Sequence, residues 1–294
     1  MQGNRFSRTA QVMALFRALE TARPRRVRLV HDPFAKTVLP TPMRGVVALS
    51  RLAPIRRGVC AIIDRRWPGA RSSGVARTRL IDDWVSAGIR DGARQVVILG
   101  AGFDSRAWRL KALAGLPVFE VDHPATSHEK RRRLRAAGLD PERVVSVGMD
   151  FSQGLLADAL DRAGLDTRQR TIVIWEGVTN YLSEDAVDAV LAWTRGLAPG
   201  SLLAFTYVHA RVLEDPSAFT GAERILAAVA RTGEAWTFAI DPAQLECRLA
   251  AYGLILVEDL GADDYRARVC GSLDADARGY AFYRAALASV TRGQ

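Results

Sequence analysis

The feature that most constrains the fold is residues 94–106, which read RQVVILGAGFDSR. The apolar, β-branched run over 94–99 predicts a buried parallel strand. It ends at Gly100 and Gly102, and Ser105 stands near the start of a helical pattern. A strand, a glycine turn and a helix form the first unit of a nucleotide-binding α/β fold.

An acidic residue follows the next apolar run at the position where such folds bind a ribose. Residues 117–121 are mostly apolar, and Asp122 comes twenty residues after Gly102. Asp122 could instead cap the helix that begins near Pro124, but together with the glycines we favour ribose binding. Ser105 stands where G-x-G-x-x-G has its last glycine, which weighs against a dinucleotide with its pyrophosphate on the helix end.

Strand and helix patterns alternate from residue 94 to the end of the chain. The predicted strands cover 94–99, 117–121, 143–148, 170–176, 201–207, 254–260 and 279–287. The predicted helices cover 105–112, 125–137, 153–163, 183–195 and 241–252, with an irregular, partly helical insert at 210–240. Repeated βα units predict a parallel sheet with helices on both faces, and ligands bind beyond the carboxyl ends of its strands.

The residues before this core are mainly helical. Helical spacing covers 8–21, 44–66 with an interruption at Pro54, and 75–91. We expect residues 1–92 to form a cap or lid over the cleft and residues 93–294 to form the core, with the 210–240 insert as a second lid-like element.

Composition excludes several classes of protein. The 294-residue chain has three cysteines and four histidines without metal-ligand spacing, so we expect neither a disulfide scaffold nor a metal site. No apolar run approaches the roughly 18 residues of a membrane span. The N-terminus lacks the apolar segment of a signal peptide. We therefore expect a cytoplasmic protein without a membrane partner.

The net charge of +9 raises the question of a nucleic-acid partner. Basic residues occur along the whole chain, and the densest clusters are at 23–28 and 130–133. Neither cluster carries the interleaved aromatic residues of a base-stacking surface. We interpret the charge as composition bias and do not expect nucleic acid to be the partner.

Polar residues follow three further strands. Asp150 could accept a hydrogen bond from an adenine amino group beside the apolar wall of Phe151, or could be a helix cap. Glu176 follows an apolar run and should point into the cleft rather than face the core unpaired. His209, after the fifth strand, could be a general base or a packing residue.

Several motifs, taken in order, resemble the leucine carboxyl methyltransferase family. The likeness is to its bacterial branch of S-adenosylmethionine-dependent O-methyltransferases and covers about residues 7–210. It rests on the motifs at 76–79 with Asp82-Asp83, 97–106, 120–122 and 176–182, supported by those at 7–10 and 32–35. Sequence spacing alone predicts that Arg77 is a solvated residue, whereas the resemblance implies that it binds a ligand.

The resemblance implies a class I methyltransferase fold, with a seven-stranded, mostly parallel sheet and a helical N-terminal cap. It also implies a role for each matching residue. Arg77 would hold the methionine carboxylate of the cofactor, and Gly100 and Gly102 would line its methionine portion. Asp122 would bind the ribose, and Asp150 with Phe151 would bind the adenine. Glu176 would lie near the amino group and the transferred methyl, and Tyr181 would lie near the acceptor.

The implied reaction is SN2 methyl transfer from S-adenosyl-L-methionine to an oxygen, aided mainly by alignment and exclusion of water. A carboxylate acceptor needs no base, whereas a hydroxyl needs one, and His209 or Glu176 is the first candidate. We expect a small-molecule acceptor, such as a natural-product intermediate, although protein-methylating members act on a C-terminal carboxylate. The alternatives are an NAD-dependent oxidoreductase, a non-catalytic methyltransferase-like binding protein and a nucleic-acid methyltransferase.

Overall fold

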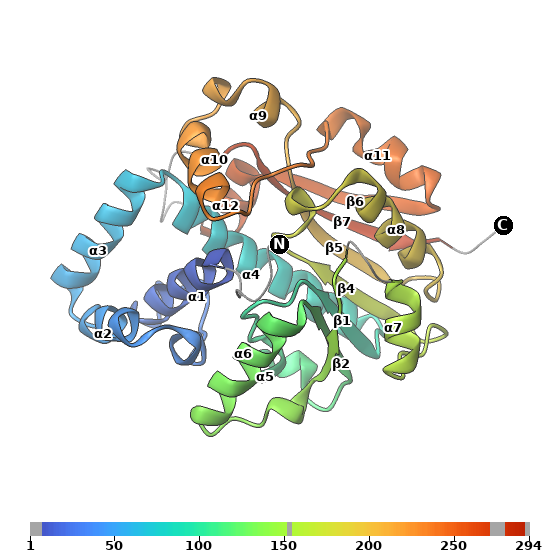
Figure 1. The fold of residues 1–294 in the computed structure, drawn as a ribbon, viewed down its shortest axis with the longest axis horizontal. Coiled ribbons are helices and arrows are strands. Elements are labelled where there is room, and N and C mark those ends of the chain that lie inside the picture. Colours follow the sequence, from blue (N-terminus) through green and yellow to red (C-terminus); the bar gives the residue numbers. More distant parts are fainter. Residues whose placement is uncertain (1–7, 152–154, 271–279, 292–294) are drawn as a thin grey trace.

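The computed structural model describes residues 8–151, 155–270 and 280–291. Ser7 of the N-terminal motif, the predicted helix start at 153 and the predicted strand start at 279 lie outside these residues. The structure is an α/β fold in which helices cover both faces of one sheet (Figure 1).

The sheet has seven strands in the order β3-β2-β1-β4-β5-β7-β6. The strands are β1 (Gln95–Leu99), β2 (Val118–Asp122), β3 (Val145–Gly148), β4 (Thr171–Trp175), β5 (Leu202–Val208), β6 (Leu254–Gly261) and β7 (Tyr283–Val290). The first five pair in parallel, and β7 runs antiparallel between β5 and β6. The predicted mostly parallel sheet is confirmed, and its chain order reverses beside β1, where β2 and β4 flank it.

Alternate side chains of the central strands supply the two core layers. On β1, Val97 and Leu99 face a layer formed with α7 (Leu156–Arg162), α8 (Glu184–Arg195) and α11 (Pro242–Ala251). Val96 and Ile98 face the opposite layer, which contains α4 (Ala70–Arg90) and α12 (Ala262–Cys270). Burial on both faces explains why these strands are continuous apolar runs in the sequence.

The helix α4 joins the N-terminal region to the sheet. A Cβ at Gly88 would lie 2.8 Å from Ile172 and from Leu202, so the helix backbone packs directly on strands β4 and β5. The helix begins five residues earlier than predicted, after Gly69, whose φ is 81°. Ser73 is buried within the helix and hydrogen-bonds to Tyr265 of α12.

Two C-terminal features differ from the prediction. The helix α12 follows β6 directly and packs against α4, although its residues show no strong helical pattern. The last strand begins at Tyr283 rather than near 279. Tyr280 has a φ of 64° and accepts a 2.9 Å hydrogen bond from the Tyr283 amide, so a turn precedes the strand.

The described residues form seven further α-helices. They are α1 (Arg8–Thr21), α2 (Thr41–Leu49), α3 (Ala53–Arg66), α5 (Arg106–Arg109), α6 (Pro124–Ala136), α9 (Arg211–Glu214) and α10 (Ala222–Arg231). In Figure 1, α2 and α3 form one end of the molecule, away from the sheet. The insert at 210–240 is irregular and partly helical as predicted, and packs with α1 in a third apolar cluster.

Candidate cofactor and acceptor site

A cavity of about 550 Å³ lies at the carboxyl ends of β1, β2 and β4. This volume is within the range of about 300–1,000 Å³ for ligand pockets. Its lining includes all but one of the site residues predicted from the sequence. The residues that line it are Arg77, Gly100, Gly102, Asp122, Asp150, Phe151, Glu176 and Tyr181. The exception is His209.

The glycine turn depends on two left-handed residues. Gly100 and Gly102 have φ angles of +64° and +48°, a region that disfavours side chains with a Cβ. A Cβ at Gly100 would lie 2.3 Å from Val178, and one at Gly102 would lie 3.0 Å from Ala10. The glycines therefore let the backbone form one wall of the cavity while the loop after β4 and helix α1 pack against it.

Asp122 ends β2 and is tied to this turn. Its carboxylate accepts hydrogen bonds from the amide of Gly102 and from its neighbour His123. Burial raises the pKa of Asp122, and these two amides partly offset that rise. A carboxylate has about four acceptor positions, so the two amides fix its orientation and leave capacity for two ribose hydroxyls.

Asp150 and Phe151 lie on the same cavity wall, after β3. The Met149 amide donates to the Asp122 carbonyl at 2.9 Å, which holds the two strand ends together. Phe151 packs against the apolar layer on the α7 side of the sheet. This acidic and aromatic pair therefore lies one strand beyond Asp122, the candidate ribose ligand, where the adenine ring of a nucleoside is expected.

Glu176, which follows β4, is held between two buried arginines. Its Oε1 accepts from Arg77 Nε at 2.9 Å, and its Oε2 accepts from Arg106 Nη2 at 2.8 Å. Burial alone would raise the pKa of Glu176, but the two guanidinium groups hold it below its usual range. Glu176 is therefore a fixed anion in the cavity wall.

This carboxylate belongs to a larger ionic network beneath the glycine turn. Arg106 also pairs with Asp104 and, at 2.8 Å, with Asp82. The network is electrically balanced, with four arginines and four carboxylates, namely Arg17, Arg77, Arg106 and Arg109 with Asp32, Asp82, Asp104 and Glu176. It joins α1, α4, the glycine turn and the end of β4, so it fixes the two N-terminal helices to the sheet.

Arg77 is only 4% exposed and enters the cavity wall from α4. Its guanidinium carbon lies 4.4 Å from the centre of the Tyr283 ring. Burial opposes the charged form, yet Tyr283 and Glu176 hold the pKa of Arg77 above its usual value. The residue is a permanently charged donor whose Nε is engaged by Glu176, while its Nη2 contacts the Met13 sulfur at 3.9 Å. A thioether is only a weak acceptor, so a ligand carboxylate could take its place at the outer nitrogens.

Tyr181 lies in a polar group that the sequence did not reveal. Burial raises the pKa of Tyr181 to about 12, so its phenol is a neutral donor at ordinary pH. Thr9, Glu234 and Trp236 line the cavity with it, and the Thr9 hydroxyl donates to Glu234 at 2.5 Å. Thr9 and Glu234 are 225 positions apart in the chain, so no local motif could have joined them.

The rest of this part of the cavity is apolar. Side chains from α1 and α10 form one wall, and aromatic rings form another; examples are Val12, Met13, Phe16, Ile225, Trp236 and Tyr280. Among the non-glycine residues that the structure describes, Tyr280 has a left-handed backbone conformation. Its ring stacks on Tyr283 at a centroid distance of 6.2 Å. Such backbone strain concentrates at functional sites.

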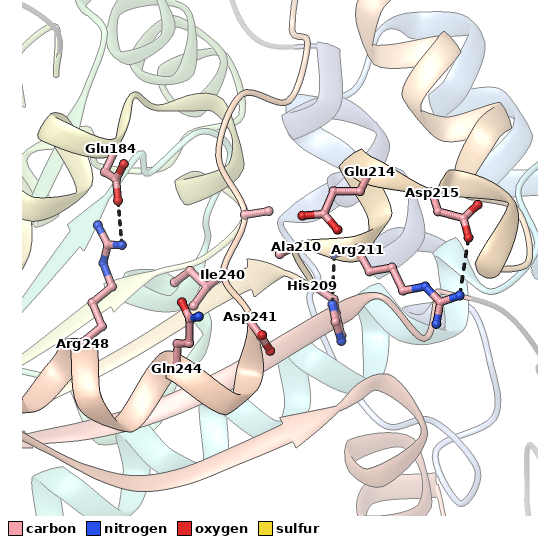
Figure 2. A pocket seen from close by; sticks show the side chains of 11 residues that line it. Glu184, His209, Ala210, Arg211, Glu214, Asp215, Ile240, Asp241, Gln244 and Arg248 are labelled. Carbon is pink, nitrogen blue, oxygen red and sulfur yellow. Dashed lines mark hydrogen bonds and ion pairs between the residues drawn. The ribbon is translucent and has the colours of Figure 1, made fainter.

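His209 lies elsewhere. It lines a separate polar depression of about 590 Å³, with Arg211, Asp241 and Arg248 around it (Figure 2). Its Nδ1 accepts from the Arg211 amide at 3.2 Å, and its ring packs against Phe219. The structure therefore does not bring His209 together with the other candidates, because β5 lies one strand further from β1 than β4 does.

Two findings concern the described residues as a whole. Within 8–151, 155–270 and 280–291, no group of three or more histidine, cysteine, aspartate or glutamate side chains is arranged to hold a metal ion. In the same ranges, no helix is both long enough and apolar enough to cross a membrane.

Solved structures share this fold. A predicted methyltransferase from Thermobifida fusca superposes with a TM-score of 0.61 at 17% identity, covering 93% of this chain and 97% of the other. A DUF574 family protein from Streptomyces avermitilis gives a TM-score of 0.59 at 20% identity, covering 81% and 91%. The fold is that of a class I methyltransferase.

Comparison of the sequence identifies the family within this fold class. The profile of the leucine carboxyl methyltransferase family matches residues 10–195. A predicted S-adenosyl-L-methionine-dependent methyltransferase of Frankia alni is 38% identical over 202 residues, 68% of either chain. Another, from Mycolicibacterium paratuberculosis, is 36% identical over 76% of this chain and 70% of its own. The chain belongs to the leucine carboxyl methyltransferase family. The names of both relatives include S-adenosyl-L-methionine, the cofactor predicted from the sequence.

Proposed function

We propose that this protein is an S-adenosyl-L-methionine-dependent O-methyltransferase that acts on a small, largely apolar molecule. The observation that carries the proposal is the single cavity into which the glycine turn, Asp122, Arg77 and the polar group around Tyr181 all open. One half offers charged and backbone groups suited to a nucleoside and an amino acid. The other half is apolar and aromatic, and suits an acceptor.

The donor half fits S-adenosyl-L-methionine residue by residue. Asp122 would accept the two ribose hydroxyls, Asp150 with Phe151 would bind the adenine, and Arg77 would pair with the carboxylate. Glu176 would face the amino group across the glycine turn. When bound, the cofactor supplies a methyl group activated by the positive charge of its sulfur.

The acceptor half supports a small molecule over a protein terminus. Tyr181 and Glu234 place polar atoms against aliphatic and aromatic walls from α1 and α10. An apolar ring system bearing one oxygen nucleophile would satisfy both kinds of surface. The phenol of Tyr181 would then orient that oxygen towards the glycine turn.

A hydroxyl acceptor would require a base, and Glu234 is the better placed carboxylate. Glu176 is already engaged by Arg77 and Arg106, and His209 lies outside the cavity. In the transfer, the acceptor oxygen forms a bond to the methyl carbon as the carbon–sulfur bond breaks. The proton of a hydroxyl would pass to the Glu234 carboxylate, whereas a carboxylate acceptor has no proton to lose.

The experiment that tests the proposal is a turnover assay that detects S-adenosyl-L-homocysteine while panels of aromatic acids and phenols are offered as acceptors. Turnover with members of either panel supports the proposal, and alkali distinguishes a labile methyl ester from a stable ether. No turnover with any acceptor, despite tight binding of the methyl donor, would favour the non-catalytic binding protein instead.

A further inference from the structure

The positive charge of this protein is concentrated in one segment. Residues 22–67 contain eleven arginine and lysine side chains and two carboxylates, so this segment alone has a net charge of +9. The rest of the chain has 30 basic and 30 acidic residues and is neutral. The excess is therefore local, which corrects the interpretation of a general composition bias. We call residues 22–67 the basic tip.

Both carboxylates of the basic tip are already paired. Asp32 is buried against Arg17, and Asp64 accepts from Arg71 at 2.8 Å. Most of the cations, in contrast, are exposed to solvent, namely Arg25, Arg26, Lys36, Arg44, Arg51, Arg57, Arg65 and Arg66. The tip therefore presents a field of one sign to anything that approaches it.

Apolar side chains are exposed among these arginines. Ten large hydrophobic residues are exposed in the described parts of the chain, and five lie within residues 46–62, namely Val46, Leu49, Leu52, Ile55 and Ile62. Ile62 is 72% exposed and Leu52 is 60% exposed. Ile55 and Ile62 are two turns apart and share one side of α3. In Figure 1, α2 and α3 stand at one end of the molecule.

We propose that the basic tip binds the surface of an anionic lipid bilayer, with α2 and α3 lying in the interface. Helices that combine exposed aliphatic residues with arginine bind in this way, through apolar burial and attraction to anionic lipids. The inference does not depend on the proposed methyl transfer. It revises only the expectation of no membrane partner, since the tip would lie on the bilayer without spanning it.

Other occupants fit less well. A second copy of the chain would bring another +9 segment against the first, and like charges repel. Nucleic acid would satisfy the arginines but not the exposed aliphatic side chains. The aromatic residues of the segment, Phe34 and Trp67, are both partly buried rather than offered for stacking on bases.

Co-sedimentation with phosphatidylcholine vesicles, with or without phosphatidylglycerol, tests the proposal on the full chain. We expect binding only when the anionic lipid is present. The triple variant Arg51→Gln, Arg57→Gln and Arg65→Gln should lower the partition coefficient about a hundredfold, from the usual contribution of each cation. The double variant Leu52→Gln and Ile62→Gln should lower it at least about tenfold.

The matched control is Ile255→Gln with Val257→Gln, which removes two exposed apolar residues from β6. It should bind anionic vesicles like the wild type, and far-ultraviolet circular dichroism should show all three variants folded. The proposal is overturned if the wild type ignores anionic vesicles or if the control loses binding equally. It is also overturned if the apolar variant binds normally and DNA displaces the protein from lipid.

Discussion

Replacing Glu176 by glutamine tests the ionic network that holds the cavity together. The side chains of Glu176, Arg77 and Arg106 are 14%, 5% and 2% exposed. Removing one partner of a buried ion pair costs about 3–5 kcal/mol. Glutamine keeps the shape and one acceptor oxygen, so we expect the lower end, about 3 kcal/mol. For a chain of this size, that loss lowers the Tm by roughly 6 °C.

The assay is urea and thermal unfolding of Glu176→Gln at neutral pH, with Glu184→Gln as the control. Glu184 also pairs with an arginine, Arg248, at 2.9 Å, but it is 67% exposed. Surface pairs contribute about 0–1 kcal/mol, so the control should unfold close to the wild type. Equal midpoints for Glu176→Gln and Glu184→Gln would refute the claim that this network stabilises the site.

The same network predicts the response to acid. Arg106 and Arg77 hold the pKa of Glu176 below its usual value, so its stabilising effect is present above the ordinary carboxyl pKa of 4.5. That effect is lost as the pH falls through the lowered pKa of the folded state. The stability difference between wild type and Glu176→Gln should therefore shrink in acid; a difference that grows below pH 4.5 would contradict this assignment.

Further predictions concern single residues of the cavity and of the separate depression that His209 lines. Asp122→Ala should weaken binding of S-adenosyl-L-methionine about 10–100-fold by calorimetry, while the exposed Asp161→Ala should not. Because burial raises the pKa of Asp122, affinity should fall on acidification, and Asp122→Asn should remove that dependence. Glu234→Gln should lower kcat for a hydroxyl acceptor by about 10²–10⁴-fold but spare a carboxylate acceptor. His209→Ala should keep full activity; a loss with intact folding would return His209 to the site.

The sequence predicts the sheet, and it brings the residues of the proposed donor half together, because the signals for both are local. Strand β1 and its glycine turn are contiguous. Asp122 ends a strand, and Asp150 and Glu176 each follow one within two residues. Since the carboxyl ends of neighbouring parallel strands meet at one edge of the sheet, predicting each strand separately already places these acids together. Arg77 was the exception, because only its resemblance to a family motif distinguished it from a surface arginine.

The acceptor half could not be predicted because it depends on contacts between distant segments. Thr9 meets Glu234 across 225 positions, and Tyr280 adopts a backbone conformation that no residue pattern signalled. His209 satisfied the same strand-end rule as the true neighbours of the turn. The rule gives the edge of the sheet but not the distance along it, and β5 stands beyond β4.

Calorimetric titration of the wild-type protein with S-adenosyl-L-methionine and, separately, with NAD distinguishes a methyl-donor site from a dinucleotide site. The geometry of the glycine turn, Asp122 and Arg77 predicts binding of one S-adenosyl-L-methionine per chain and no heat with NAD. Binding of NAD without binding of the methyl donor would contradict the assignment of this cavity to S-adenosyl-L-methionine.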